Sequence, residues 1–142
     1  PHRMEFITQN DYTIIDDTYN ASYDSVVYSL DVLSRLKGRK IAVLGDILEL
    51  GEFSEDIHRK IGKYLAGKPI DYLVTVGSMS CFIEDEAIKN GFSLQHTRHF
   101  EQNEEAINYL DELIEAGDIV LVKASHGLFF IQIVEGLLHE NK

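Results

Sequence analysis

Cysteine is nearly absent from this chain, whose 142 residues include only Cys81. A single cysteine cannot form a disulfide within the chain, and chains without disulfides are typical of a reducing compartment. We therefore expect a cytoplasmic protein. Cys81 falls early in an expected helix, where a small buried hydrophobic side chain is a better interpretation than a reactive thiol.

Basic residues are also scarce, because 13 Lys and Arg residues stand against 24 Asp and Glu residues and give a net charge of −11. This balance argues against a nucleic acid or an anionic membrane as the partner. A bound nucleotide would therefore need local help from Lys or Arg side chains, a helix N-terminus or Mg²⁺.

Long apolar runs and glycine-rich phosphate motifs are missing too. No run approaches the length of a membrane span, and no signal peptide is visible. The chain opens on Pro1-His2-Arg3 without an initiator methionine, which indicates a piece of a longer protein. Neither Gly-x-x-x-x-Gly-Lys-Ser/Thr nor Gly-x-Gly-x-x-Gly occurs, so we expect no triphosphate cradle in this chain alone and no dinucleotide site. His96 and His99 would point to opposite faces of a strand, and we predict no metal site.

Apolar periodicity predicts strands and helices that alternate along the chain. Residues 1–12 are interpreted as a short strand or hinge that enters a single domain, 1–142. Alternation with short connections is typical of an α/β fold with an open, mostly parallel, Rossmann-like sheet and helices on both faces. The expected strands are 13–17, 41–44, 71–76, 94–99 and 119–122, and the expected helices are 23–36, 55–66, 79–90, 102–116 and 127–138.

Small residues mark the expected helix ends. Ser22 and Ser54 are suitable N-caps, and Gly38 is a suitable end for the first helix. Ser125 is expected to cap the last helix, which would leave backbone N–H groups free to bind an anion.

Asp16 and Asp17 follow the first buried strand and precede a helix. The carboxyl ends of parallel strands are where open α/β sheets bind ligands, and an aspartate there can accept hydrogen bonds from both hydroxyls of a ribose. A solvated turn explains the same residues about equally well. Lys123 follows the last strand and would reach Asp16 or Asp17, either as part of a site or as an ordinary ion pair.

A second loop, Gly45-Asp46-Ile47-Leu48-Glu49-Leu50-Gly51, faces the same edge of the sheet. Two glycines are explained by a structural turn, but Asp46 and Glu49 together are not. His58 would either point back at this loop or pack in the core.

In this order along the chain, several segments together resemble the C-terminal domain of the Mur ligases. The segments are His2-Arg3-Met4-Glu5, Asp16-Asp17-Thr18-Tyr19-Asn20-Ala21, Val43 to Gly51 with His58, Thr75-Val76-Gly77, His99-Phe100 and Leu121-Val122-Lys123-Ala124-Ser125. The resemblance is greatest to the branch that adds D-alanyl-D-alanine to UDP-N-acetylmuramoyl-tripeptide in peptidoglycan synthesis. It implies a three-domain ligase that uses ATP and Mg²⁺, with the ion held mainly by the central domain, and that proceeds through an acyl phosphate. The fragment alone is expected to be inactive.

The resemblance also implies roles for single residues. Arg3 would contact the ATP phosphates, Asp17 the ribose, and Asn20 and Tyr19 the nucleotide, while Asp46 would line the cleft that closes on ATP. The expected contacts to D-alanyl-D-alanine or the acyl phosphate come from the other end of the chain, namely Lys123, Ser125 and His126.

Two positions depart from the family pattern. His126 stands where the family usually has an arginine, and a histidine cannot make the bidentate contact to a carboxylate that an arginine makes. Ser22-Tyr23 replaces the usual proline of the first helical turn, which keeps the cap but loses preorganisation.

A receiver domain phosphorylated on aspartate is the alternative function, because it also has an acidic pair after its first strand and a lysine after its last. It needs an aspartate at the end of the strand 71–76, where Val76-Gly77-Ser78 stands. A dehalogenase-type phosphatase would need an acid at position 18, which is threonine. A non-catalytic scaffold domain is the third possibility.

Overall fold

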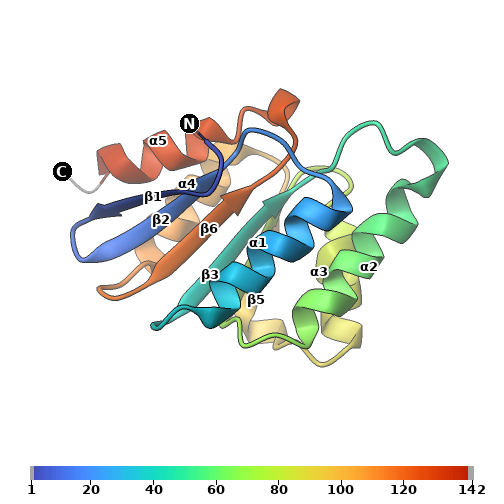
Figure 1. Ribbon diagram of the computed structural model, residues 1–142, viewed down its shortest axis with the longest axis horizontal. Coiled ribbons are helices and arrows are strands. Elements are labelled where there is room, and N and C mark those ends of the chain that lie inside the picture. The colour runs from blue at the N-terminus through green and yellow to red at the C-terminus, as the bar shows by residue number, and fades with distance from the viewer. Residues whose placement is uncertain (1, 141–142) are drawn as a thin grey trace.

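A six-stranded sheet forms the centre of the domain (Figure 1). The computed structural model describes residues 2–140. The sheet order is β1-β2-β6-β3-β4-β5, and every neighbouring pair is parallel except β1 and β2. The predicted open, mostly parallel sheet is thus confirmed. Its strands are β1 (Glu5–Gln9), β2 (Tyr12–Asp17), β3 (Lys40–Gly45), β4 (Tyr72–Val76), β5 (Thr97–Phe100) and β6 (Ile119–Lys123).

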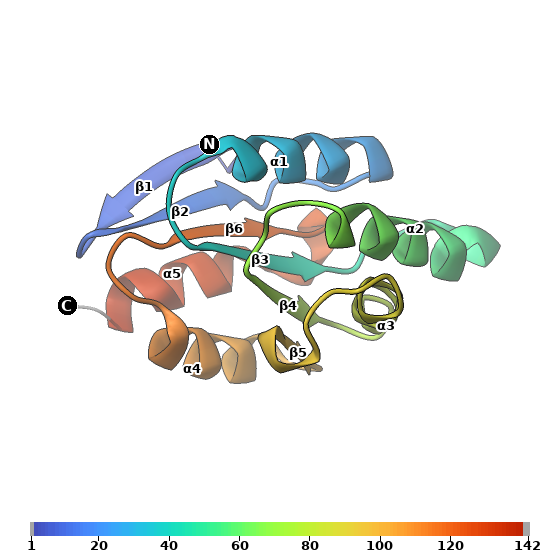
Figure 2. The same cartoon turned by 90° about the horizontal axis from the view of Figure 1, so that it is seen from below.

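Helices cover both faces of the sheet (Figure 2). The first hydrophobic cluster joins one face to α1 (Tyr23–Arg35), α2 (Ser54–Ala66) and α3 (Cys81–Lys89). The second joins the other face to α4 (Asn103–Leu113) and α5 (Ile131–Glu140). Because successive strand side chains point to opposite faces, Ile15 enters the first cluster and Ile14 the second. Coverage on both faces explains why the inner strands are continuous apolar runs.

The first strand forms a hairpin that the sequence did not predict, since residues 1–12 were interpreted as a short strand or hinge. Residues 5–9 pair antiparallel with β2 through a two-residue turn at Asn10 and Asp11, whose φ angles are 50° and 69°. Positive φ at both turn residues is the signature of the tight hairpin turn that suits twisted strands. This hairpin brings the chain before Glu5 back beside the carboxyl end of β2.

Two predicted elements begin later than expected. The strand predicted at 94–99 is a 3₁₀ turn, Leu94–His96, followed by β5. His96 stacks on Tyr72 at 4.2 Å between ring centroids, and this contact holds the turn against the sheet edge. The helix predicted at 127–138 is likewise a 3₁₀ turn, His126–Leu128, followed by α5. Other helix ends differ by one to three residues.

Among the predicted helix caps, the N-cap of α1 was correct. The Ser22 side chain accepts from the Ser25 backbone N–H, and the Ser25 hydroxyl accepts from the Ser22 N–H in return. Ser54 is the first residue of α2 rather than its cap, and Leu36, not Gly38, caps the C-terminus of α1. Within residues 2–140, no helix combines the length and the apolar character needed to cross a membrane.

Candidate functional site

A buried ion pair lies at the carboxyl ends of β2 and β6. The parallel register places Asp17 beside Lys123, and Lys123 Nζ donates to Asp17 Oδ2 at 2.8 Å. Both residues are buried. Lys123 Nζ also donates to the Asn20 backbone carbonyl at 3.1 Å. The predicted reach of the lysine to the acidic pair is confirmed, with Asp17 as its partner.

The Asp17 carboxylate has two further donors. The Met4 backbone N–H donates to Oδ1 at 3.1 Å, and the Ser29 hydroxyl donates to Oδ2 at 2.5 Å. A carboxylate offers about four acceptor positions, so three are in use and about one remains. Asp17 can therefore accept one incoming hydroxyl without losing a partner, whereas accepting both hydroxyls of a ribose would displace one.

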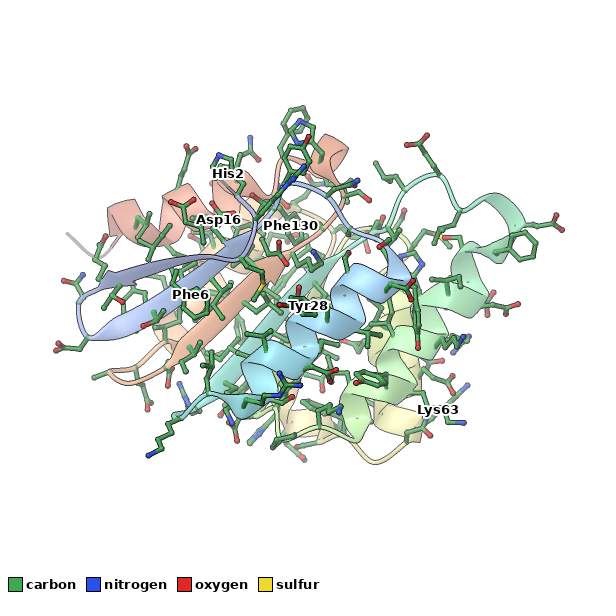
Figure 3. The ribbon with its side chains drawn as sticks, viewed as in Figure 1. His2, Phe6, Asp16, Tyr28, Lys63 and Phe130 are labelled. Carbon is green, nitrogen blue, oxygen red and sulfur yellow. The ribbon has the colours of Figure 1, made fainter. Side chains whose placement is uncertain are left out.

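A cavity of about 310 Å³ opens above this pair. It lies between the carboxyl ends of β2 and β6 and the N-terminal part of α1, the helix that carries Tyr28 (Figure 3). Arg3 and Lys123 bring two cations into it, which is the local positive charge that an acidic chain needs to hold an anion. The cavity is lined by Arg3, Met4, Asp17, Tyr19, Asn20, Ala21, Ser22, Ser25, Tyr28, Ser29 and Lys123.

Aromatic and basic side chains are stacked beside the cavity. The Arg3 guanidinium lies over the Tyr19 ring, 3.9 Å from its centroid, and Tyr19 in turn lies 6.0 Å from the His126 ring. Tyr19 is 45% exposed, so part of its side chain remains accessible to a ligand. Asn20 is exposed, and its side-chain oxygen accepts from the Ala21 N–H at 2.9 Å. The stack holds the Arg3 guanidinium at the rim of the sheet, which is the edge formed by the carboxyl ends of β2, β6 and β3 with their loops.

Asp46 lies beneath the rim and does not line the cavity. Its Oδ1 accepts from the Met79 and Ser80 N–H groups at 3.0 and 2.7 Å, and its Oδ2 accepts from the Ser78 hydroxyl at 3.4 Å. A carboxylate at this place satisfies the free N–H groups at the start of α3. Gly77 makes the approach possible, since a Cβ there would lie 2.6 Å from Asp46 Oδ1. The ATP contact predicted for Asp46 stays a prediction.

Two side chains fix the loop that follows β3. His58 is fully buried, its Nε2 accepts from the Ile47 N–H at 3.0 Å, and its Nδ1 donates to the Ser54 carbonyl at 2.7 Å. The Ser125 hydroxyl accepts from the Leu48 N–H at 2.9 Å. His58 thus points back at the loop, one of the two predicted alternatives. Ser125 does not cap α5, because its hydroxyl is used by the loop and α5 begins only at Ile131.

The remaining histidine and cysteine predictions concern side chains outside the cavity. The His99 ring forms hydrogen bonds with the Thr75 and Glu101 side chains. His96 lies just before β5, on the other side of the sheet, and stacks on the Tyr72 ring. Cys81 is half-buried, and burial raises the pKa of its thiol. A raised pKa leaves less thiolate, so Cys81 is not set up as a nucleophile.

Comparison with known proteins identifies the family. The family model described as Mur ligase, glutamate ligase domain, matches residues 2–126. The chain belongs to this family. The UDP-N-acetylmuramoyl-tripeptide--D-alanyl-D-alanine ligase of Bacillus subtilis is 34% identical over 96% of this chain and 30% of its own length. The enzyme of that name from Escherichia coli is 30% identical over 87% of this chain and 26% of its own length.

Solved structures agree with the sequence relatives. The MurF ligase of Thermotoga maritima in complex with ADP has a TM-score of 0.84 and 28% identity, and covers 99% of this chain and 31% of its own. MurF of Acinetobacter baumannii has a TM-score of 0.88 and 30% identity over 97% of this chain and 30% of its own. The Mur ligase domain described here therefore spans about a third of the length of the relatives it matches. The mostly parallel α/β fold is that of the family.

Five of the eight predicted site residues line one cavity, namely Arg3, Asp17, Tyr19, Asn20 and Lys123. His126 lies next to it across Tyr19, while Asp46 and Ser125 support the loops below. Ser29 and Met4 were missed. Ser29 had a signal, because a serine two turns into α1 on its buried face needs a polar partner. No sequence signal could have revealed the Met4 contact, since it comes from a backbone N–H that the hairpin places beside Asp17.

Proposed function

We propose that this domain closes over ATP in a ligase that joins D-alanyl-D-alanine to UDP-N-acetylmuramoyl-tripeptide, in the cytoplasm, for peptidoglycan synthesis. The observation that carries the proposal is the cavity at the ends of β2 and β6 with the buried Asp17–Lys123 pair as its floor. Family membership and the ADP bound by the similar MurF ligase of Thermotoga maritima support a nucleotide as its ligand. The N-terminal and central domains of the same enzyme would supply the other half of the site.

In this proposal the nucleotide contacts come from the residues along the cavity. The free acceptor position of Asp17 takes one ribose hydroxyl, and the open face of Tyr19 packs near the base with Asn20 beside it. Arg3, held extended by Tyr19, offsets negative charge on the phosphates during phosphoryl transfer. Asp46 supports this rim by tying together the loops that follow β3 and β4.

Mg²⁺ does not fit this cavity as a resident ion. Its lining residues offer one carboxylate, Asp17, which already accepts three hydrogen bonds, and they add two cations. Because Mg²⁺ prefers several oxygen ligands in octahedral geometry, it would be held by the nucleotide and the central domain.

The acceptor side of the site would lie toward His126. An imidazole can donate one hydrogen bond to the dipeptide carboxylate, where the family arginine would donate two. Lys123 orients this rim through Asp17, and Ser125 positions it through Leu48. In the proposed reaction ATP phosphorylates the tripeptide carboxylate, and the D-alanyl-D-alanine amine displaces phosphate to form the amide.

Asp17→Ala in the full-length enzyme tests the nucleotide assignment. We expect the KM for ATP to rise at least about tenfold, the cost of roughly one hydrogen bond to a charged group. The KM for UDP-N-acetylmuramoyl-tripeptide should stay the same, and circular dichroism should show that the variant is folded. Asp56→Ala, an exposed aspartate of α2, is the matched control. Unchanged ATP kinetics in a folded Asp17→Ala enzyme would contradict the assignment.

A further inference from the structure

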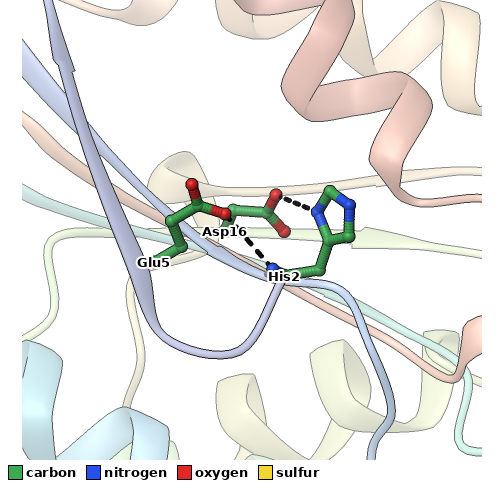
Figure 4. A group of neighbouring side chains, drawn as sticks. All are labelled: His2, Glu5 and Asp16. Carbon is green, nitrogen blue, oxygen red and sulfur yellow. Dashed lines mark hydrogen bonds and ion pairs between the residues drawn. The ribbon is translucent and has the colours of Figure 1, made fainter.

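A second group of titratable side chains lies on the other side of β2 from the nucleotide cavity. His2, Glu5 and Asp16 each offer one ligand atom, and these atoms all lie within 4.8 Å of one another (Figure 4). The antiparallel register of β1 and β2 places Glu5 opposite Asp16. His2 Nδ1 lies 2.6 Å from Asp16 Oδ2, and the Glu5 side chain accepts from the His2 backbone N–H at 3.2 Å.

Backbone contacts hold His2 in this place without help from its imidazole. The Tyr19 N–H donates to the His2 carbonyl at 2.9 Å, and the Met4 N–H donates to Asp17. Both His2 and Met4 have positive φ, at 66° and 47°. Residues other than glycine keep such angles only where their surroundings enforce them, and these angles cluster at functional sites. The cluster is thus preformed by the turn that enters β1.

Charge distinguishes Asp16 from the other buried aspartates of residues 2–140. Asp17 faces Lys123, Asp118 faces Arg39, and Asp46 faces the N-terminus of α3. Asp16 is 1% exposed, and His2 is its one ion-pair partner within the described chain. A buried carboxylate needs a compensating positive charge, and with a neutral His2 it has none. Glu5 adds a second negative charge to the same group.

The surroundings of Asp16 resemble the outer shell of a metal site. Its Oδ1 accepts from the Thr18 N–H at 3.2 Å and from the Thr18 hydroxyl at 2.7 Å, which leaves Oδ2 directed at His2. Ligating carboxylates are commonly oriented by such hydrogen bonds. The His2 side chain is 44% exposed and Glu5 is exposed, so both can move the short way needed to surround an ion.

We propose that His2, Glu5 and Asp16 bind one divalent ion of the Zn²⁺ class. One imidazole nitrogen and two carboxylate oxygens are a three-ligand set that Zn²⁺ accepts with a fourth position open for water or an anion. Mg²⁺ is excluded as the resident ion, since it favours oxygen ligands and octahedral geometry. The ion takes the place of the hydrogen bond between His2 Nδ1 and Asp16 Oδ2, and it joins the chain ahead of β1 to the end of β2.

Calorimetric titration of the 142-residue chain with ZnCl₂ tests this site directly. We expect saturable binding of one ion per chain and a rise in the midpoint of thermal unfolding. His2→Ala and Glu5→Gln should each abolish the saturable phase. Thr18→Val, which keeps all three ligands but removes the hydroxyl that donates to Asp16 Oδ1, should weaken it by about 10–100-fold, as loss of an outer-shell hydrogen bond does. His96→Gln, a histidine outside the cluster, should bind like the wild type.

Glu5→Gln keeps the test decisive if another variant does not fold, because Glu5 is exposed at the start of an edge strand. Absence of saturable binding, or binding that survives both His2→Ala and Glu5→Gln, would overturn the proposal and indicate adventitious zinc on other side chains. The measurement needs neither ATP nor the other domains. Its outcome is therefore independent of the proposed ligase function.

Discussion

At the residue scale, the Asp17–Lys123 pair links the stability of the domain to the candidate site at the rim. Within residues 2–140, Lys123 is the ion-pair partner of the buried Asp17, and both side chains come from the last positions of adjacent parallel strands. Removal of one member leaves an uncompensated charge in a low-dielectric site, which costs far more than the loss of an exposed ion pair. The pair therefore serves stability and the site together.

Lys123→Met should lower the free energy of unfolding by about 3 kcal/mol, the lower end of the range for a broken buried pair. The lower end applies because Ser29 and Met4 continue to donate to Asp17. Urea denaturation at neutral pH measures the loss. The double variant Lys123→Met, Asp17→Asn removes the orphaned charge and should recover part of it. A loss below about 1 kcal/mol for the single variant would show that the pair is solvated.

The residues found from the sequence are those whose chemistry is local. Asp17 and Lys123 lie at the ends of β2 and β6, and strand ends in a parallel sheet meet at one edge. Tyr19 and Asn20, which come soon after β2, were assigned through the resemblance to the family. The partners of Asp46 could not be found in this way, because they come from the start of α3, more than thirty residues further on. Nor could the group of His2, Glu5 and Asp16, whose proximity depends on the register of a hairpin that was interpreted only as a strand or hinge.

At the element scale, apolar periodicity predicts the elements that depend on local sequence and misses those that depend on contacts with distant residues. The positions of the helices and the inner strands were predicted because their apolar spacing is strong. The 3₁₀ turns at Leu94–His96 and His126–Leu128 replaced regular structure where a ring contact and the positive φ of Phe129 redirect the chain. Tertiary contacts of this kind override local preference.

Close packing of α2 on α3 gives a prediction about one glycine. A Cβ at Gly62 would lie 2.2 Å from the Ile83 carbonyl oxygen, so Gly62→Ala must push the two helices apart. We expect a loss of about 1–3 kcal/mol, the usual cost of overpacking. Gly67→Ala is the matched control, because its Cβ would meet nothing closer than 3.7 Å. Equal stability of the two variants in thermal or urea unfolding would contradict the close approach.

At the scale of the whole molecule, two packed cores contrast with an open cavity at the carboxyl ends of the strands. Both faces of the sheet are covered, and the two hydrophobic clusters are built from residues of this chain alone. The cavity, in contrast, offers one free carboxylate acceptor position, an exposed aromatic ring and two cations, with no glycine-rich phosphate loop in the sequence. Folding and nucleotide binding should therefore separate when the chain is studied alone.

We expect the isolated 142-residue chain to unfold cooperatively yet bind ATP at least about a hundredfold more weakly than the full-length enzyme, with no ligation. The net charge of −11 repels a polyanion, and Arg3 and Lys123 offset that repulsion only locally. Because long-range repulsion is screened by salt, ATP binding by the isolated chain should not weaken as salt rises, in contrast to sites held by free surface cations. Calorimetry of both proteins at two salt concentrations measures this. Equal affinity of the chain and the full-length enzyme would mean that the cavity holds the triphosphate by itself, and the division of the site between two domains would then be wrong.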